Sequence, residues 1–114
     1  MRSSPGAEIL PADKSMAQLE RKAAEAASLL KLLANEKRLL ILCYLAVRGE
    51  MTVGELVGVV KLSQSALSQH LSKLRAHGLV EFRRAAQTLH YRVADPRALR
   101  MLQSLKEIFC GELK

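Results

Sequence analysis

The stretch that decides the fold is Ser63-Gln64-Ser65-Ala66-Leu67-Ser68-Gln69-His70-Leu71-Ser72-Lys73-Leu74-Arg75-Ala76-His77-Gly78. It begins with a residue type that caps helices and stops at a glycine, so it predicts a single helix. One face of that helix is apolar and carries Leu67, Leu71 and Leu74. The opposite face has no acid and carries Gln64, Ser65, Ser68, Gln69 and Lys73. Short hydroxyls and amides can reach base edges and phosphates in a DNA groove, which indicates a recognition helix.

A shorter helix is predicted directly before this one, from Val53 to Val60. Thr52 and Glu55 have the spacing of a capping box at its start, and Lys61-Leu62 makes the turn to the next helix. Two helices joined by a tight turn, the second of them polar and free of acids, are typical of a helix-turn-helix.

Two strands are predicted after the recognition helix, and Gly78 is placed to take a left-handed conformation between them and the helix. Leu79 to Arg84 and Leu89 to Val93 each alternate apolar and polar residues, and Ala85 to Thr88 bridge them. The result is a β-hairpin with a basic flank. After a helix-turn-helix, such a hairpin is a wing that can lie along the DNA backbone or minor groove.

Two further helices are predicted before the helix-turn-helix. The first runs from about Ser15 to Leu33 and has a narrow apolar seam. The seam consists of Met16, Leu19, Ala23, Ala26, Leu30 and Leu33. It suits either the core of one chain or a subunit interface. The second helix has Asn35 as its N-cap, continues to about Val47 and ends at Gly49.

A last helix is predicted from Asp95, its N-cap, with Pro96 at the first position, to Leu113. Leu99, Leu102, Leu105, Ile108 and Phe109 form its apolar face. This face is a natural partner for the seam of the first helix across a dimer interface. The predicted fold is therefore mainly α-helical with a small β-hairpin wing, and the element order is four helices, two strands and one helix.

The composition bounds the class of protein. The chain has 114 residues and a net charge of +7, from 18 basic and 11 acidic residues. This length suits one domain, here residues 15–114, after a flexible tail over residues 1–14. The charge favours a nucleic-acid partner, although a basic protein without one has the same composition. No apolar run reaches the roughly 20 residues of a membrane span, and no secretory signal is evident, so we expect cytoplasmic residence with reduced thiols.

The chain resembles the ArsR/SmtB family of winged-helix repressors. Residues 33–42 resemble the family's entry into the second helix, residues 62–75 its recognition helix, and residues 78–80 and 90–93 its wing. The resemblance covers roughly residues 15–110. It implies a homodimer that is formed by the first and last helices, binds an inverted repeat in double-stranded DNA and releases it when an inducer acts.

The resemblance also implies the DNA contacts. Gln64, Ser65, Ser68 and Gln69 would face the major groove, and Lys73, Arg83, Arg84 and Gln87 would contact phosphates or the minor groove. His70 has two interpretations: it either contacts DNA or packs beside Leu67 and Leu71.

Many relatives sense metals, but the sequence argues against a metal or any other cofactor here. The family's third-helix site needs a cysteine pair, and this chain has Glu55-Leu56-Val57-Gly58-Val59 in that place. The site on the last helix needs histidines, and that helix has none. His77 and His90 are best explained as ordinary surface or wing residues.

Two cysteines remain, Cys43 on the second helix and Cys110 near the end of the last. A free cysteine is often only a small buried apolar residue, and the neighbours of Cys43 suit burial. However, the pair resembles that of the BigR and SqrR branch of the family, whose repressors sense persulfides and sulfide. That resemblance implies that the two thiols form a disulfide or a polysulfide bridge, which shifts the two helix-turn-helix units relative to each other.

A direct disulfide needs Cα atoms within roughly 7 Å, so a separation of around 8 to 10 Å would favour a polysulfide bridge. Peroxide, an organic electrophile or arsenite are alternative inducers at the same cysteines. An enzyme is not indicated, because no nucleophile and base, phosphate-binding loop or carboxylate pair is evident. A protein-interaction module that uses the same fold without DNA is the remaining alternative.

Overall fold

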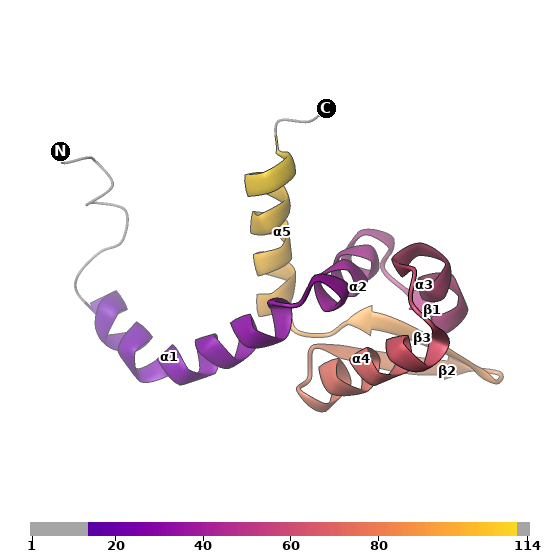
Figure 1. Cartoon of the computed structure of the whole chain (residues 1–114). Helices are drawn as coiled ribbons and strands as arrows, with labels where there is room; N and C mark the ends of the chain where they lie inside the picture. Colours follow the sequence, from indigo (N-terminus) through magenta and orange to yellow (C-terminus); the bar gives the residue numbers. More distant parts are fainter. Residues whose placement is uncertain (1–13, 112–114) are drawn as a thin grey trace. The chain divides into compact units, whose positions relative to one another are not determined.

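The computed structural model describes residues 14–111, which form five helices and three strands (Figure 1). In chain order these are α1 (Lys14–Leu33), α2 (Glu36–Arg48), β1 (Met51–Thr52), α3 (Val53–Val60), α4 (Gln64–Ala76), β2 (Val80–Ala85), β3 (Thr88–Val93) and α5 (Pro96–Cys110). The chain divides into two units, residues 1–31 and 32–114. The tail predicted over residues 1–14 lies outside the described residues except for Lys14, which begins α1.

The first unit is essentially α1. Its predicted seam is largely uncovered, because Met16, Leu19 and Leu30 are all exposed large apolar residues. A helix of 20 residues with an exposed apolar seam does not complete its packing by itself.

In the second unit, α2 begins and ends where its caps predict. The side chain of Asn35 accepts a hydrogen bond from the backbone N–H of Arg38 at 3.0 Å. At the other end Gly49 has a φ of +88°, a conformation that favours glycine. Ile41, Leu42 and Leu45 form the buried face of the helix.

The predicted helix-turn-helix is present. The capping box at the start of α3 is complete, because Thr52 and Glu55 each accept a hydrogen bond from the other's backbone N–H. Ser63 caps α4 by accepting from the N–H of Ala66 at 3.1 Å. Between the helices, Lys61 takes a left-handed conformation with a φ of +61°, which makes the turn tight.

The sheet has one strand more than predicted. β1, β3 and β2 lie side by side in that order, all antiparallel, so β3 is the central strand. The hairpin loop is also shorter than predicted: Ala85 pairs with Thr88, and only Ala86 and Gln87 form the turn. β1 was not predicted from the sequence, because two residues are too few to show an alternating hydrophobic pattern. The strand exists only through its pairing with β3.

The last helix begins as predicted, with Asp95 accepting from the N–H of Arg97 at 2.8 Å and Pro96 in the first turn. α5 ends at Cys110, and the predicted extension to Leu113 lies outside the described residues apart from Gly111. α5 packs against α2 and β3. The core that joins the elements of the second unit includes the fully buried Leu42, Leu56 and Leu71.

Candidate nucleic-acid interface and thiol pair

The recognition helix predicted from sequence is α4. Its apolar face is completely buried at Leu67, Leu71 and Leu74, against a neighbourhood that includes α3 and β2. Five predicted DNA-contacting residues are exposed on it: Gln64, Ser65, Ser68, Gln69 and Lys73. The helix has no acidic residue, so its exposed face presents only neutral and positive groups to a polyanion.

His70 is a residue of α4 that the charge of Arg38 on α2 influences. It is half-buried, and burial lowers the pKa of its imidazole, with further lowering by the charges of Arg38 and Lys73. The ring is therefore neutral at physiological pH. Of the two interpretations offered by the sequence, partial packing agrees with this environment, while a DNA contact stays a prediction.

A lysine of α2 joins that helix to the helix-turn-helix. The Nζ atom of Lys37 donates a hydrogen bond to the carbonyl oxygen of Val60 at 3.4 Å. Val60 is the last residue of α3, where carbonyl oxygens lack partners within the helix. This link was not predicted, because the two residues are 23 positions apart and no spacing rule relates them.

The wing residues differ in their surroundings. Arg84 and Gln87 are exposed, and Gln87 lies in the hairpin turn beside Ala86, whose φ is +58°. Arg83 is also exposed, but its guanidinium donates to both carboxylate oxygens of Glu50, with Nε to Oε2 at 2.9 Å. This ion pair lowers the pKa of Glu50 and raises that of Arg83. The predicted phosphate contact of Arg83 would compete with it.

The outer face of the sheet holds a second ion pair, between Arg92 and Glu81, which face each other across β2 and β3. The sequence predicts a basic flank for this hairpin. In the structure, at least two arginines of this flank have carboxylate partners, so the flank is less positive than its arginines alone suggest.

The two cysteines lie on helices that pack together. Cys43 is half-buried on α2, and Cys110 is the exposed last residue of α5; both are free thiols. Burial raises the pKa of Cys43, and the negative charge that Cys110 acquires on ionisation raises it further. The second effect requires the two sulfur atoms to be near enough to interact electrostatically.

Several large apolar residues near the two cysteines in the chain are exposed. Ile108 and Phe109, the residues just before Cys110, are 71% and 77% exposed. On α2, Leu40 and Val47 are also exposed, and they lie one turn before and one turn after Cys43. Apolar surface of this kind favours contact with another protein surface.

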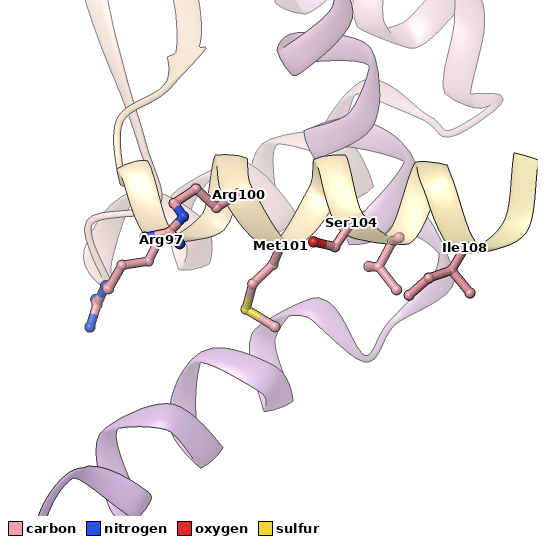
Figure 2. A pocket seen from close by; sticks show the side chains of 6 residues that line it. Arg97, Arg100, Met101, Ser104 and Ile108 are labelled. Atoms are coloured by element: carbon pink, nitrogen blue, oxygen red, sulfur yellow. The ribbon is translucent and has the colours of Figure 1, made fainter. Parts of the chain in front are cut away.

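α5 also lines a surface pocket of about 470 Å³. Figure 2 shows its lining residues along α5, among them Arg97, Met101 and Ile108. Within residues 14–111 no cluster of three or more histidine, cysteine or acidic side chains could hold a metal ion. None of the helices described is long and apolar enough to cross a membrane.

A helix-turn-helix followed by a hairpin wing defines a winged helix-turn-helix DNA-binding regulator, and comparison with known proteins agrees. Residues 35–81 match the family model of the bacterial regulatory proteins of the arsR family. The chain belongs to the ArsR family. Its relatives are transcriptional regulators, so the chain is a regulator and not an enzyme.

Several relatives cover nearly the whole chain. It is 44% identical to the transcriptional activator HlyU of Vibrio cholerae, over 87% of this chain and 91% of the relative. It is 45% identical to the biofilm growth-associated repressor of Agrobacterium fabrum, over 82% and 79% of the two chains. The solved structure of the transcriptional repressor BigR from Xylella fastidiosa matches with a TM-score of 0.78 and 40% identity, over 83% and 96%. Reduced HlyU from Vibrio cholerae matches with a TM-score of 0.76 and 46% identity, over 82% and 97%.

Proposed function

We propose that this regulator is a homodimeric, cytoplasmic repressor that binds an inverted repeat in operator DNA and releases it when Cys43 and Cys110 react with persulfides. The observation that carries the proposal is that the two thiols lie on packed helices and that a negative charge on Cys110 raises the pKa of Cys43. Repression, rather than activation, follows the relatives from Agrobacterium fabrum and Xylella fastidiosa, which are named repressors.

The DNA contacts proposed here divide by groove. Gln64, Ser65, Ser68 and Gln69 face the major groove, where amides and hydroxyls read base edges. Lys73, Arg84 and Gln87 contact phosphates or the minor groove, and Arg83 joins them only if it leaves Glu50. His70 is neutral and contributes through packing or a hydrogen bond rather than charge.

The dimer is proposed to form through α1 and α5. α1 leaves Met16, Leu19 and Leu30 exposed, and α5 leaves Ile108 exposed. A symmetric dimer places two recognition helices about one turn of DNA apart, so that each reads one half of the inverted repeat.

The thiol chemistry begins at Cys110, because it is the exposed member of the pair. Its thiolate attacks the outer sulfur of a low-molecular-weight persulfide, becomes a protein persulfide and releases the corresponding thiolate. The thiolate of Cys43 then attacks the Cys110 sulfur, forms the disulfide and releases hydrosulfide. The transferred sulfur is reduced and the two cysteines are oxidised. If the Cys110 persulfide gains a second sulfur first, the Cys43 thiolate attacks the middle sulfur of that chain. Hydrosulfide is again released, and one extra sulfur remains in the bridge between the two cysteines.

A covalent bridge between α2 and α5 favours whichever dimer geometry accommodates it. Half-site spacing is strict, so a small rotation of the two helix-turn-helix units lowers operator affinity. The bridge thus acts like a ligand that stabilises the low-affinity state. A structure of HlyU from Vibrio cholerae has been solved in a reduced form, which is consistent with redox chemistry in that relative.

The test measures release of promoter DNA by fluorescence anisotropy after treatment with glutathione persulfide, hydrogen peroxide or arsenite. Mass spectrometry of each sample identifies the product at the cysteines. We expect only the persulfide to release DNA and to yield the bridge. The variants Cys43→Ser and Cys110→Ser should bind DNA as well as the wild type and remain bound under persulfide.

Release of the Cys43→Ser, Cys110→Ser double variant by persulfide would refute the thiol switch. Release by peroxide or arsenite alone would replace the persulfide with that inducer. Binding that is unaffected by salt, or absent, would refute the DNA-binding function itself and favour a protein-interaction module.

A further inference from the structure

We propose that Arg75 is a positioning residue for operator recognition, whose guanidinium holds the ring of Phe82 and so sets the direction of the wing relative to α4. The inference rests on the proposed function, because it takes α4 and the wing as the two DNA-binding parts. It adds a residue pair that belongs to neither predicted set of DNA contacts.

The contact joins the end of α4 to β2. The guanidinium carbon of Arg75 lies 4.3 Å from the centroid of the Phe82 ring, well within the range of a cation–π interaction. Arg75 lies in the last turn of α4, two turns after Ser68 and on the same flank of the helix. It therefore faces the wing from the side of α4 that also carries a predicted base contact.

The ring of Phe82 is held from a second side by Tyr91. The two residues pair across β2 and β3, and their rings meet edge to face with centroids 5.4 Å apart at 64°. Tyr91 is buried in the central strand of the sheet. Arg75, Phe82 and Tyr91 thus form a continuous row from the recognition helix to the middle of the wing.

The row lies where the wing leaves the core. At the base of the hairpin, Leu79 and Val80 are buried, and the N–H of Leu79 donates to the carbonyl of Leu74 at 2.9 Å. The hairpin turn at Ala86 lies about 13 Å beyond Phe82, at the usual rise of a strand. Because a small rotation at the base moves the tip much further, a contact at Phe82 controls the direction of Arg84 and Gln87.

A direct phosphate contact by Arg75 is the competing explanation, since a stacked guanidinium keeps its in-plane N–H donors uncovered. The two roles differ in what they predict. A phosphate contact loses affinity for any DNA and lowers the salt dependence of binding, whether or not the ring is present. A positioning contact acts through Phe82 and affects the operator complex more than the complex with random DNA.

The experiment is a double-mutant cycle with Arg75→Gln, Phe82→Leu and the double variant, measured on operator and random DNA by anisotropy at several salt concentrations. Arg48→Gln is the matched control. It removes the same charge and another cation–π contact, with Tyr44 at 5.4 Å, at a site on α2. Arg84→Gln shows how loss of a wing arginine that is proposed to touch phosphate affects the salt dependence.

We expect each single variant to weaken operator binding about three- to fivefold, with a smaller change on random DNA. The double variant should bind operator DNA no more weakly than the single variant with the lower affinity, because both substitutions remove the same contact. Arg48→Gln should leave the ratio of operator to random affinity unchanged. Phe82→Tyr, which keeps the ring, should bind as the wild type does.

Additive losses in the double variant would overturn the proposal, as would an Arg75→Gln salt dependence reduced as much as that of Arg84→Gln. Circular dichroism and titration of the active fraction distinguish a folding defect from a binding defect. If Phe82→Leu does not fold, Phe82→Met, which also removes the ring, takes its place in the cycle. If the wild type itself does not bind DNA, the proposed function fails together with this inference. If it binds and the cycle is additive, only the role of Arg75 fails.

Discussion

The helices α4 and α5 differ in how completely the chain covers their apolar faces. α4 buries Leu67, Leu71 and Leu74 along its whole length. α5 buries only Ala98 and Leu102, both in its first half, while Ile108 and Phe109 near its end stay exposed. One chain therefore completes the packing of the recognition helix, whereas the end that carries Cys110 leaves apolar surface for a partner.

This difference in burial matches the two roles proposed for α4 and α5. A helix that reads DNA must present its side chains in one geometry, and full burial of its inner face fixes that geometry. A helix that carries a reactive thiol must let reagents in and must be able to move when a bond forms. The exposed side chain of Cys110 meets the first of these needs.

The largest expected effect contrasts Leu71→Ala with Ile108→Ala. Leu71 is 1% exposed, so its truncation should lower the free energy of unfolding by about 3 kcal/mol at every protein concentration. Ile108→Ala should instead weaken the dimer, so its loss of stability should be small where neither protein dimerises and should grow as protein concentration rises. Urea unfolding at low and high concentration measures both. If the Ile108→Ala loss did not depend on concentration, α5 would not be part of the dimer interface.

An intermediate effect is expected at the wing. Glu50→Gln removes the carboxylate that binds Arg83, so the freed guanidinium can meet phosphate and random DNA should bind about two- to threefold more tightly. The salt dependence of binding should steepen as well. Glu36→Gln, at the exposed start of α2, is the matched control for the change in net charge. Equal gains in both variants would mean that Arg83 does not reach DNA even when free.

The smallest effect concerns the thiols. Burial and the Cys110 thiolate both raise the pKa of Cys43, so Cys110→Ser removes one cause and should lower that pKa, while burial keeps it above its ordinary value. At alkaline pH, where thiols ionise, the Cys43 thiolate fraction rises and alkylation of Cys43 becomes faster. The pH profile of its reaction with iodoacetamide measures the shift. An unchanged midpoint would show that the two sulfur atoms do not interact.

Local signals made much of the fold predictable. Asn35, Thr52, Ser63 and Asp95 are each followed by an apolar helical pattern, and each caps the helix that the sequence predicts. The polar face of α4 was equally visible, because its residues alternate with leucines at helical spacing. These features depend on neighbours within one or two turns.

The contacts that the sequence did not reveal are long-range. Glu50 and Arg83 are 33 positions apart, and Arg75 meets Phe82 only after the chain reverses at Gly78. No spacing rule links such residues, since their proximity depends on how the sheet pairs. The electrostatic effect of Cys110 on Cys43 is likewise invisible to spacing rules, and only the resemblance to a family led us to expect that the two cysteines interact.

The strand β1 has a consequence for how far this protein can be cut down. Met51 is almost fully buried and pairs with Tyr91 of the hairpin, so the link between α2 and α3 is bonded directly to the wing. Excision of the hairpin would strip that link of its backbone partners and uncover the methionine. A minimal DNA-reading peptide therefore has to retain the wing, even for a target that offers it nothing to bind.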